Sequence, residues 1–194
     1  MSWIEIIGAL FGAVSVYLSV RENIWSWPTA IVNVFLYIFV FHGAKLYADM
    51  GLQVVYLVLS FYGWYQWLYG GTGRTELPVS QTPPKRAMLM LLAAALFAVV
   101  LGVTLKKSTD ASLPYWDAAT TSFSLLAQWM MTRKLLENWL IWIAVDVVYV
   151  GMYIKKALYP TALLYAVFLV LAVLGYRAWK KSLREGRLPA LSET

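Results

Sequence analysis

Five aromatic and acidic residues recur at spacings of three and four in the segment 139–154, which places them on one stripe of a helix. They are Trp139, Trp142, Asp146, Tyr149 and Tyr153. A carboxylate in an apolar helix needs a partner or a cavity, and aromatic faces attract flat cations. The stripe therefore predicts a cavity wall in which rings stack on a ligand and Asp146 pairs with its positive charge. An interfacial aromatic belt is the alternative, but it does not explain a carboxylate at mid-span.

Polar side chains form stripes on three further segments, where they are candidates to bind the polar part of a ligand. These stripes are Thr29, Asn33 and Tyr37, then Gln53, Tyr56, Ser60 and Gly63, and finally Asp117, Thr120, Ser124 and Gln128. In membranes such side chains also hydrogen-bond neighbouring helices, contributing about 0.6–2 kcal/mol each. For Asn33, Gln53 and Gln128 both roles stay open. The predicted substrate-binding residues are Trp139, Trp142, Asp146, Tyr149, Asn33, Gln53, Tyr56 and Gln128.

Several kinds of chemistry find no support in the sequence. The chain has no cysteine and one histidine, so no His/Cys metal spacing occurs, and it has no G-x-x-x-x-G-K-[ST] phosphate loop. We therefore expect no metal, no cofactor and no catalytic residue. A membrane enzyme acting on a lipid would need a reactive cluster near a headgroup plane, whereas these polar stripes lie at mid-span. A scaffold or sensor that transports nothing would leave the stripes unexplained.

The composition places these stripes in a lipid bilayer. Hydrophobic residues make up 61% of the chain and charged residues 13%, against about 25% charged residues in a soluble domain. Apolar windows of about 20 residues predict seven membrane-spanning helices. They cover residues 3–20, 27–41, 47–69, 86–105, 115–132, 139–154 and 159–179. The first residues lack the basic region and cleavage site of a signal peptide, so the first helix is expected to stay in the mature protein.

Lysine and arginine set the expected orientation, because cytoplasmic loops are enriched in both. Of the 16 such residues, five fall on one side of the membrane and eleven on the other, including those of the basic segment that follows Trp179. This distribution predicts a cytoplasmic C-terminus in a multi-pass membrane protein. The net charge of +6 is located at helix ends, so no nucleic-acid partner is expected.

The chain contains an internal repeat with a constant offset, which is the separation between Tyr47 and Tyr159. The other pairs that match at this repeat offset include Arg21 and Arg133, Trp27 and Trp139, Tyr37 and Tyr149, Leu52 and Leu164, Gly63 and Gly175, and Trp67 and Trp179. Two three-helix units of equal orientation need one linker helix between them. We therefore predict a 3+1+3 arrangement of parallel repeats, with the substrate site between the halves. The units are 1–69 and 113–180, separated by a loop and linker helix at 70–112 and followed by a cytoplasmic tail at 181–194.

Short motifs are distributed over nearly the whole chain. They are Leu46-Tyr47-Ala48, Leu52-Gln53, Tyr62-Gly63-Trp64-Tyr65-x-Trp67, Tyr115-Trp116-Asp117-Ala118, Met131-Thr132-Arg133-Lys134 and Glu137-Asn138-Trp139-Leu140-x-Trp142-x-x-x-Asp146. In these motifs the chain resembles the PnuC-type nicotinamide riboside transporter family. The resemblance implies an all-α fold similar to that of the sugar-exporting SWEET proteins, a homotrimer, and a place in the bacterial inner membrane. It also implies facilitated diffusion of an unphosphorylated vitamin, which a cytoplasmic vitamin kinase then traps by phosphorylation.

Asp146 bears on the identity of that vitamin. In this family nicotinamide riboside carriers usually have Asn at the last motif position, whereas thiamine-transporting relatives tend to have Asp. The pyridinium of nicotinamide riboside and the thiazolium of thiamine are both flat cations that suit an aromatic wall with a carboxylate. We expect uptake of one of these two. The alternatives are another vitamin or nucleoside, such as riboflavin or a deoxynucleoside, and a lipid-modifying membrane enzyme.

Overall fold

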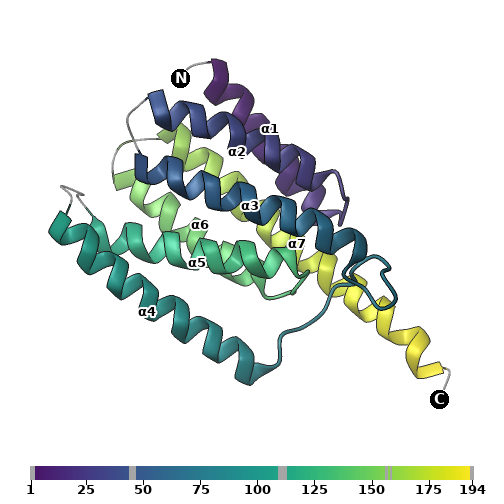
Figure 1. The fold of residues 1–194 in the computed structure, drawn as a ribbon. Coiled ribbons are helices and arrows are strands. Elements are labelled where there is room, and N and C mark those ends of the chain that lie inside the picture. The colour runs from purple at the N-terminus through teal and green to yellow at the C-terminus, as the bar shows by residue number, and fades with distance from the viewer. Residues whose placement is uncertain (1–2, 44–46, 109–112, 156, 158, 193–194) are drawn as a thin grey trace.

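A computed structural model describes residues 3–43, 47–108, 113–155, 157 and 159–192, and these residues form a bundle of seven helices. Figure 1 shows the helices running roughly side by side, with the final helix extending beyond the others at the C-terminal end. They are α1 (Trp3–Val20), α2 (Ser26–Gly43), α3 (Tyr47–Tyr69), α4 (Pro84–Ser108), α5 (Pro114–Thr132), α6 (Asn138–Lys155) and α7 (Tyr159–Ser192). The number of helices agrees with the prediction from hydropathy.

The last helix corrects one expected boundary. Hydropathy predicts an end near Trp179, yet α7 continues to Ser192. An apolar window marks where a chain leaves the hydrocarbon, and a helix can continue into water when its residues favour helix. Lys181 and Glu185 lie one turn apart in this extension, with 3.6 Å between Nζ and Oε1. The chain therefore stays helical after Trp179, and Lys180, Lys181 and Arg184 are exposed in this continuation of α7.

In the part of the chain that the structure describes, five helices are long and apolar enough by themselves to cross a membrane. These candidate spans are Trp3–Val20, Ser26–Gly43, Pro84–Ser108, Asn138–Lys155 and Thr161–Gly186. Helices α3 and α5 fall outside this group, although they have 23 and 19 residues. They contain the stripes of Gln, Ser, Thr and acidic residues, which lower their mean hydropathy. Polar side chains of this kind are tolerated at membrane depth where they face a bundle interior or a cavity.

Helix α4 lies at the edge of the bundle (Figure 1), and among the described residues it packs against α5 alone. The contact is close, because the Ser122 hydroxyl donates to the Ala94 carbonyl at 2.6 Å. A Cβ on Gly102 would lie 2.6 Å from the ring of Tyr115. Helix α4 therefore presents most of its surface away from the bundle, and apolar side chains such as Leu89, Leu92 and Leu96 are exposed there.

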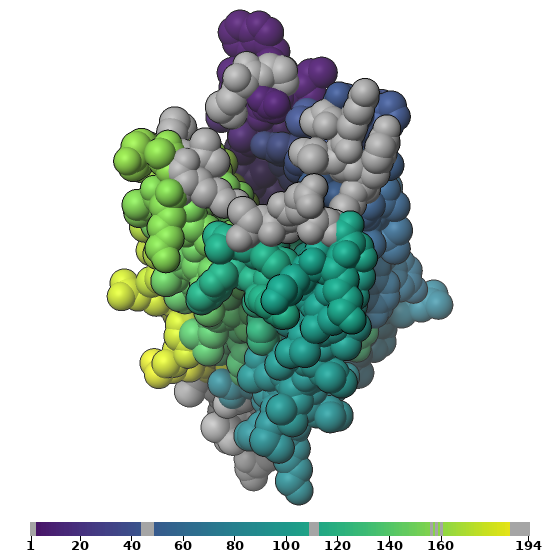
Figure 2. Space-filling view, turned by 90° about the vertical axis from the view of Figure 1, so that its left-hand side faces the viewer, coloured from purple at the N-terminus to yellow at the C-terminus, as the bar shows by residue number. Residues whose placement is uncertain are grey.

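The other six helices make contacts that join the two ends of the sequence. Helix α1 packs on α7 and α3 packs on α5, in addition to the contacts between neighbours in sequence. Figure 2 looks onto the end of the bundle at which α1 begins. In this view α6 and α7 lie on the left, α2 and α3 on the right, and α1 at the top. The first three helices and the last three thus surround a shared centre.

Local structure also recurs at the repeat offset. The turns after α1 and α5 place Glu22 at φ 54° and Lys134 at φ 46°, a left-handed conformation that few residues other than glycine adopt. In both turns the amide of that residue donates at 3.1 Å to a carbonyl three residues earlier, that of Ser19 or Met131. Equivalent segments of the two halves therefore fold in the same way.

A cluster of one glycine and two tryptophans occurs at the same offset. Its two copies are Gly63, Trp27 and Trp67, and Gly175, Trp139 and Trp179. The rings stand edge to face in each copy, with centroids 5.3 Å apart in the first and 5.4 Å apart in the second. Each glycine lets an indole approach a helix backbone that a side chain would cover. These clusters explain why glycine and tryptophan match between the halves.

The loop between α3 and α4 is docked against the second of these turns. Ser80 forms a short bridge, its amide donating to Lys134 O at 3.0 Å and its carbonyl accepting from the Leu136 amide at 2.9 Å. The hydroxyl and amide of Thr82 both donate to Glu137, at 3.0 and 3.1 Å. This loop therefore anchors the turn that contains Lys134.

Candidate substrate cavity

Described residues of the six helices α1–α3 and α5–α7 line a cavity of about 460 Å³, and no described residue of α4 does so. Small-molecule sites generally have volumes of about 300–1,000 Å³. Its wall contains all eight residues that the sequence analysis predicts as substrate-binding: Asn33, Gln53, Tyr56, Gln128, Trp139, Trp142, Asp146 and Tyr149. The structure thus brings together stripes from four helices. Their contact with a substrate stays a prediction.

Asp146 is the charged group of this cavity. It lies midway along α6, only 4% of its surface is exposed, and it lines the cavity wall. Its side chain forms no hydrogen bond or ion pair with another described residue. A buried carboxylate without a partner is costly, and the cost falls when a cation binds beside it. The cavity is therefore suited to a positively charged ligand.

Three tyrosines form an aromatic wall along α6 and α7. Tyr165 lies between the other two, with ring centroids 4.6 Å from Tyr149 and 5.2 Å from Tyr153. Tyr149 and Tyr153 are themselves nearly parallel, at an interplanar angle of 21°. All three line the cavity. They offer ring faces on which a flat cation can stack.

Tyr165 is a cavity residue that the sequence analysis missed. The internal repeat contains the signal that identifies it, because Tyr165 is the repeat equivalent of Gln53, a predicted site residue. The position that matches Asp146 in the first half is Val34, which also lines the cavity. The second half thus supplies the charged side of the cavity, whereas the described lining residues of the first half are all uncharged.

The two tryptophans of the predicted site differ in their surroundings. Trp139 is 1% exposed, its indole covers Gly175, and it stands edge to face against Trp179. It is a core residue that closes one end of the cavity. Trp142 is half-buried and lines the same wall as Asp146. Of the two, Trp142 is therefore better placed to stack on a ligand.

The polar residues divide into two groups. Asn33 donates from Nδ2 to Gly8 O at 2.7 Å and joins α2 to α1, while Tyr56 and Ser124 share a 2.7 Å hydrogen bond that joins α3 to α5. Both therefore hold helices together as well as lining the cavity. Gln53 and Gln128 line the cavity, and their side chains make no hydrogen bond to any other described residue. Their amides are available to the hydroxyl or amide groups of a ligand.

Comparison with known proteins identifies the family to which this chain is similar. Residues 2–181 match the family described as "Nicotinamide mononucleotide transporter". The nicotinamide riboside transporter PnuC of Escherichia coli strain K12 is 28% identical over 217 residues, covering 99% of this chain and 91% of that protein. The riboflavin/roseoflavin transporter RibM of Streptomyces davaonensis is 26% identical over 194 residues, covering 97% of this chain and 90% of that protein.

A solved structure is similar over nearly the same extent. It is described as the crystal structure of the vitamin B3 transporter PnuC, superposes with a TM-score of 0.76, and is 26% identical in sequence. The match covers 95% of this chain and 83% of that one. These relatives are transporters rather than enzymes. The protein therefore belongs to the nicotinamide mononucleotide transporter family and is a PnuC-type membrane transporter.

Proposed function

We propose that this transporter takes up an unphosphorylated cationic B vitamin, either nicotinamide riboside or thiamine. Asp146 is the observation on which the proposal rests, because its buried carboxylate faces the cavity without a partner among the described residues. A flat cation would stack against Trp142 and the tyrosine wall and neutralise Asp146. Gln53 and Gln128 would hydrogen-bond the hydroxyl or amide groups of the same ligand.

Riboflavin is the alternative that the relative RibM suggests. It is larger than either cation and has no positive charge at neutral pH. Binding it would leave Asp146 buried and unpaired, which is unfavourable. The acidic cavity therefore favours a cationic vitamin over riboflavin or a neutral deoxynucleoside.

The proposed mechanism is alternating access by two halves. In a 3+1+3 arrangement, α1–α3 and α5–α7 are parallel repeats, α4 is the linker, and the cavity lies between the repeats. Rocking of one half against the other would expose the cavity to each side in turn. Nothing in this scheme requires an ion gradient or ATP, so transport would be facilitated diffusion.

The proposal extends to the cellular setting. Lysine and arginine are concentrated at the end of the bundle where α7 emerges, which supports a cytoplasmic C-terminus in the bacterial inner membrane. A cytoplasmic vitamin kinase would trap the product by phosphorylation. Resemblance to the PnuC family supports a homotrimer. These features are independent of which vitamin is carried.

Liposomes that contain only this protein should take up one of the two cations and no riboflavin. Uptake should stop when the internal concentration equals the external one, because no energy source is present. Enclosing the matching vitamin kinase and ATP should then drive accumulation of the phosphorylated product. The measurement is entry of radiolabelled nicotinamide riboside, thiamine and riboflavin, with protein-free liposomes as the control. Entry of riboflavin alone, or of none of the three, would contradict the proposal.

A further inference from the structure

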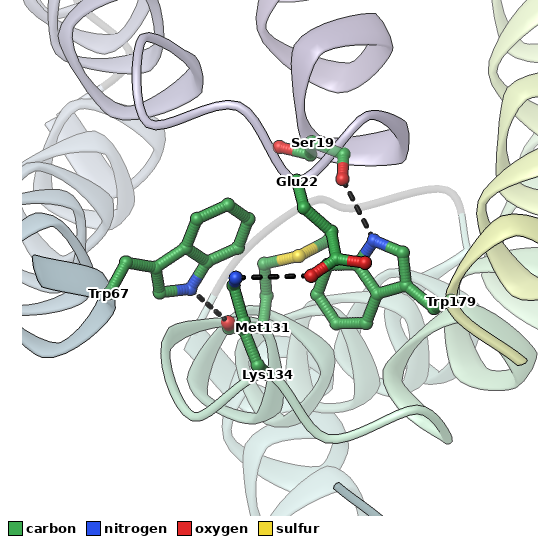
Figure 3. A network of polar contacts seen from close by, with 6 residues as sticks. All are labelled: Ser19, Glu22, Trp67, Met131, Lys134 and Trp179. Carbon is green, nitrogen blue, oxygen red and sulfur yellow. Dashed lines mark hydrogen bonds and ion pairs between the residues drawn. The ribbon is translucent and has the colours of Figure 1, made fainter. Parts of the chain in front are cut away.

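Two reciprocal hydrogen bonds join the halves of the bundle at the end where α1 gives way to α2 and α5 to α6. The indole of Trp67 donates to Met131 O at 3.0 Å, and the indole of Trp179 donates to Ser19 O at 2.9 Å. The two donors are equivalent positions of the repeat, and so are the two acceptors. Each half thus donates one indole hydrogen bond to a backbone carbonyl of the other half (Figure 3).

An ion pair lies between these two bonds. Lys134 Nζ is 3.2 Å from Glu22 Oε2 and 4.6 Å from the centre of the Trp67 ring. Glu22 and Lys134 also occupy equivalent positions of the repeat, on the two turns with left-handed backbone. Figure 3 shows the carboxylate and the ammonium meeting between the two indoles. The repeat therefore places opposite charges where its two copies face each other.

This contact lies directly behind one end of the cavity. Trp27 and Trp139 line that end, and both belong to a buried apolar cluster that also includes Trp67, Met131 and Trp179. Neither charged residue of the pair lines the cavity, and the Lys134 side chain is only 7% exposed. The apolar cluster and the ion pair thus separate the cavity from solvent at this end.

The same region contains polar atoms that the closed arrangement leaves without partners. Within the described residues, Ser26 Oγ, Asn138 Oδ1 and the indole nitrogens of Trp27 and Trp139 are buried and make no hydrogen bond. The residues that carry these atoms form two pairs at the repeat offset, Ser26 with Asn138 and Trp27 with Trp139. Burying such atoms is unfavourable, and water would reach them if the halves separated here. Closure at this end therefore needs contacts that offset this cost.

We propose that Glu22, Lys134, Trp67 and Trp179 form the gate at this end of the cavity. The ion pair and both indole–carbonyl bonds break when the halves move apart and form again when they close. Packed interfaces tend to switch between two discrete arrangements, which suits a transporter that alternates between states. The proposal rests on the rocking motion proposed above but does not depend on which vitamin is carried.

Side-specific labelling tests this gate without any substrate. The chain has no cysteine, so Ser19→Cys introduces a single thiol at the gated end of the cavity. A membrane-impermeant maleimide is applied to one side or the other of sealed vesicles. Lys134→Met breaks the pair and leaves Glu22, whose side chain is 24% exposed, able to reach water. We expect about tenfold faster labelling from the gated side, reflecting a larger open population.

Two further variants and one control define the result. Trp179→Phe removes one indole donor and should increase labelling from the same side. The exchange Glu22→Lys with Lys134→Glu should label more slowly than Lys134→Met, because opposite charges again face each other. Lys181→Met is the control, because it removes only an exposed ion pair with Glu185. Its thiol should be labelled at the same rate as that of the parent. Three results would each overturn the gate. They are an unchanged labelling rate in Lys134→Met and Trp179→Phe, an equal increase of the rate from both sides, and a rate in the charge-exchange variant as high as in Lys134→Met.

Discussion

Replacing Asp146 with asparagine should weaken binding of the cationic vitamin by about 30-fold or more, the loss expected when one partner of a buried charge pair is removed. The substitution keeps the size and shape of the side chain, so the cavity and the tyrosine wall stay intact. Uptake by liposomes should fall in parallel at substrate concentrations below the dissociation constant. Quenching of tryptophan fluorescence by the ligand measures the affinity, because Trp142 lines the same wall.

The empty protein should respond in the opposite direction. Asp146→Asn removes a buried carboxylate that has no partner among the described residues, so the free energy of unfolding should rise by about 1–2 kcal/mol. Thermal unfolding in detergent without ligand measures this change. Asp49→Asn on α3 is the matched control, because Asp49 is exposed and does not line the cavity. Unchanged affinity in Asp146→Asn would exclude the proposed counter-ion role.

Replacing Gly63 with alanine should destabilise the protein by about 3 kcal/mol, the upper part of the range for an overpacked core. The added Cβ would lie closer to the Trp27 indole than van der Waals contact allows, 2.6 Å from its Cζ3. That indole cannot withdraw easily, because it is 3% exposed and stands edge to face against Trp67. Gly175→Ala should behave in the same way, since its Cβ would meet Trp139 at 2.6 Å.

The matched control lies on the same helix as Gly63. A Cβ on Gly51 would meet no atom within 4 Å, so Gly51→Ala should be neutral or slightly stabilising through its higher helix propensity. The measurement is the midpoint of thermal unfolding in detergent for the three alanine variants. A midpoint for Gly63→Ala equal to that of Gly51→Ala would show that the close indole contact does not determine stability.

The number and placement of the helices could be read from the sequence because hydropathy and helical periodicity are local properties. The predicted ends of α1 and α3 coincide with those in the structure. The helical stripes also assigned Asp146 and Gln53 to one cavity, because polar residues in a membrane-spanning helix must face the interior of the bundle or a cavity. Residue types and spacing along single helices were sufficient for this.

Local patterns could not show how each polar residue is satisfied. Asn33 and Tyr56 lie on the predicted stripes, yet each is hydrogen-bonded to a neighbouring helix as well as lining the cavity. Tyr165 shows no polar stripe of its own, and its position beside Tyr149 depends on the packing of α7 against α6. The end of α7 was also missed, since hydropathy reports membrane depth and not helix continuity.

The contacts between the halves were decided by tertiary structure alone. The sequence predicted two equivalent halves, but nothing in it indicates that Glu22 and Lys134, at equivalent positions, would meet as an ion pair. Such a pairing requires the two turns to face each other, which depends on how α1 packs on α7 and α3 on α5. A repeat in sequence specifies the shape of each unit. The packing of the units against each other determines which side chains touch across the cavity.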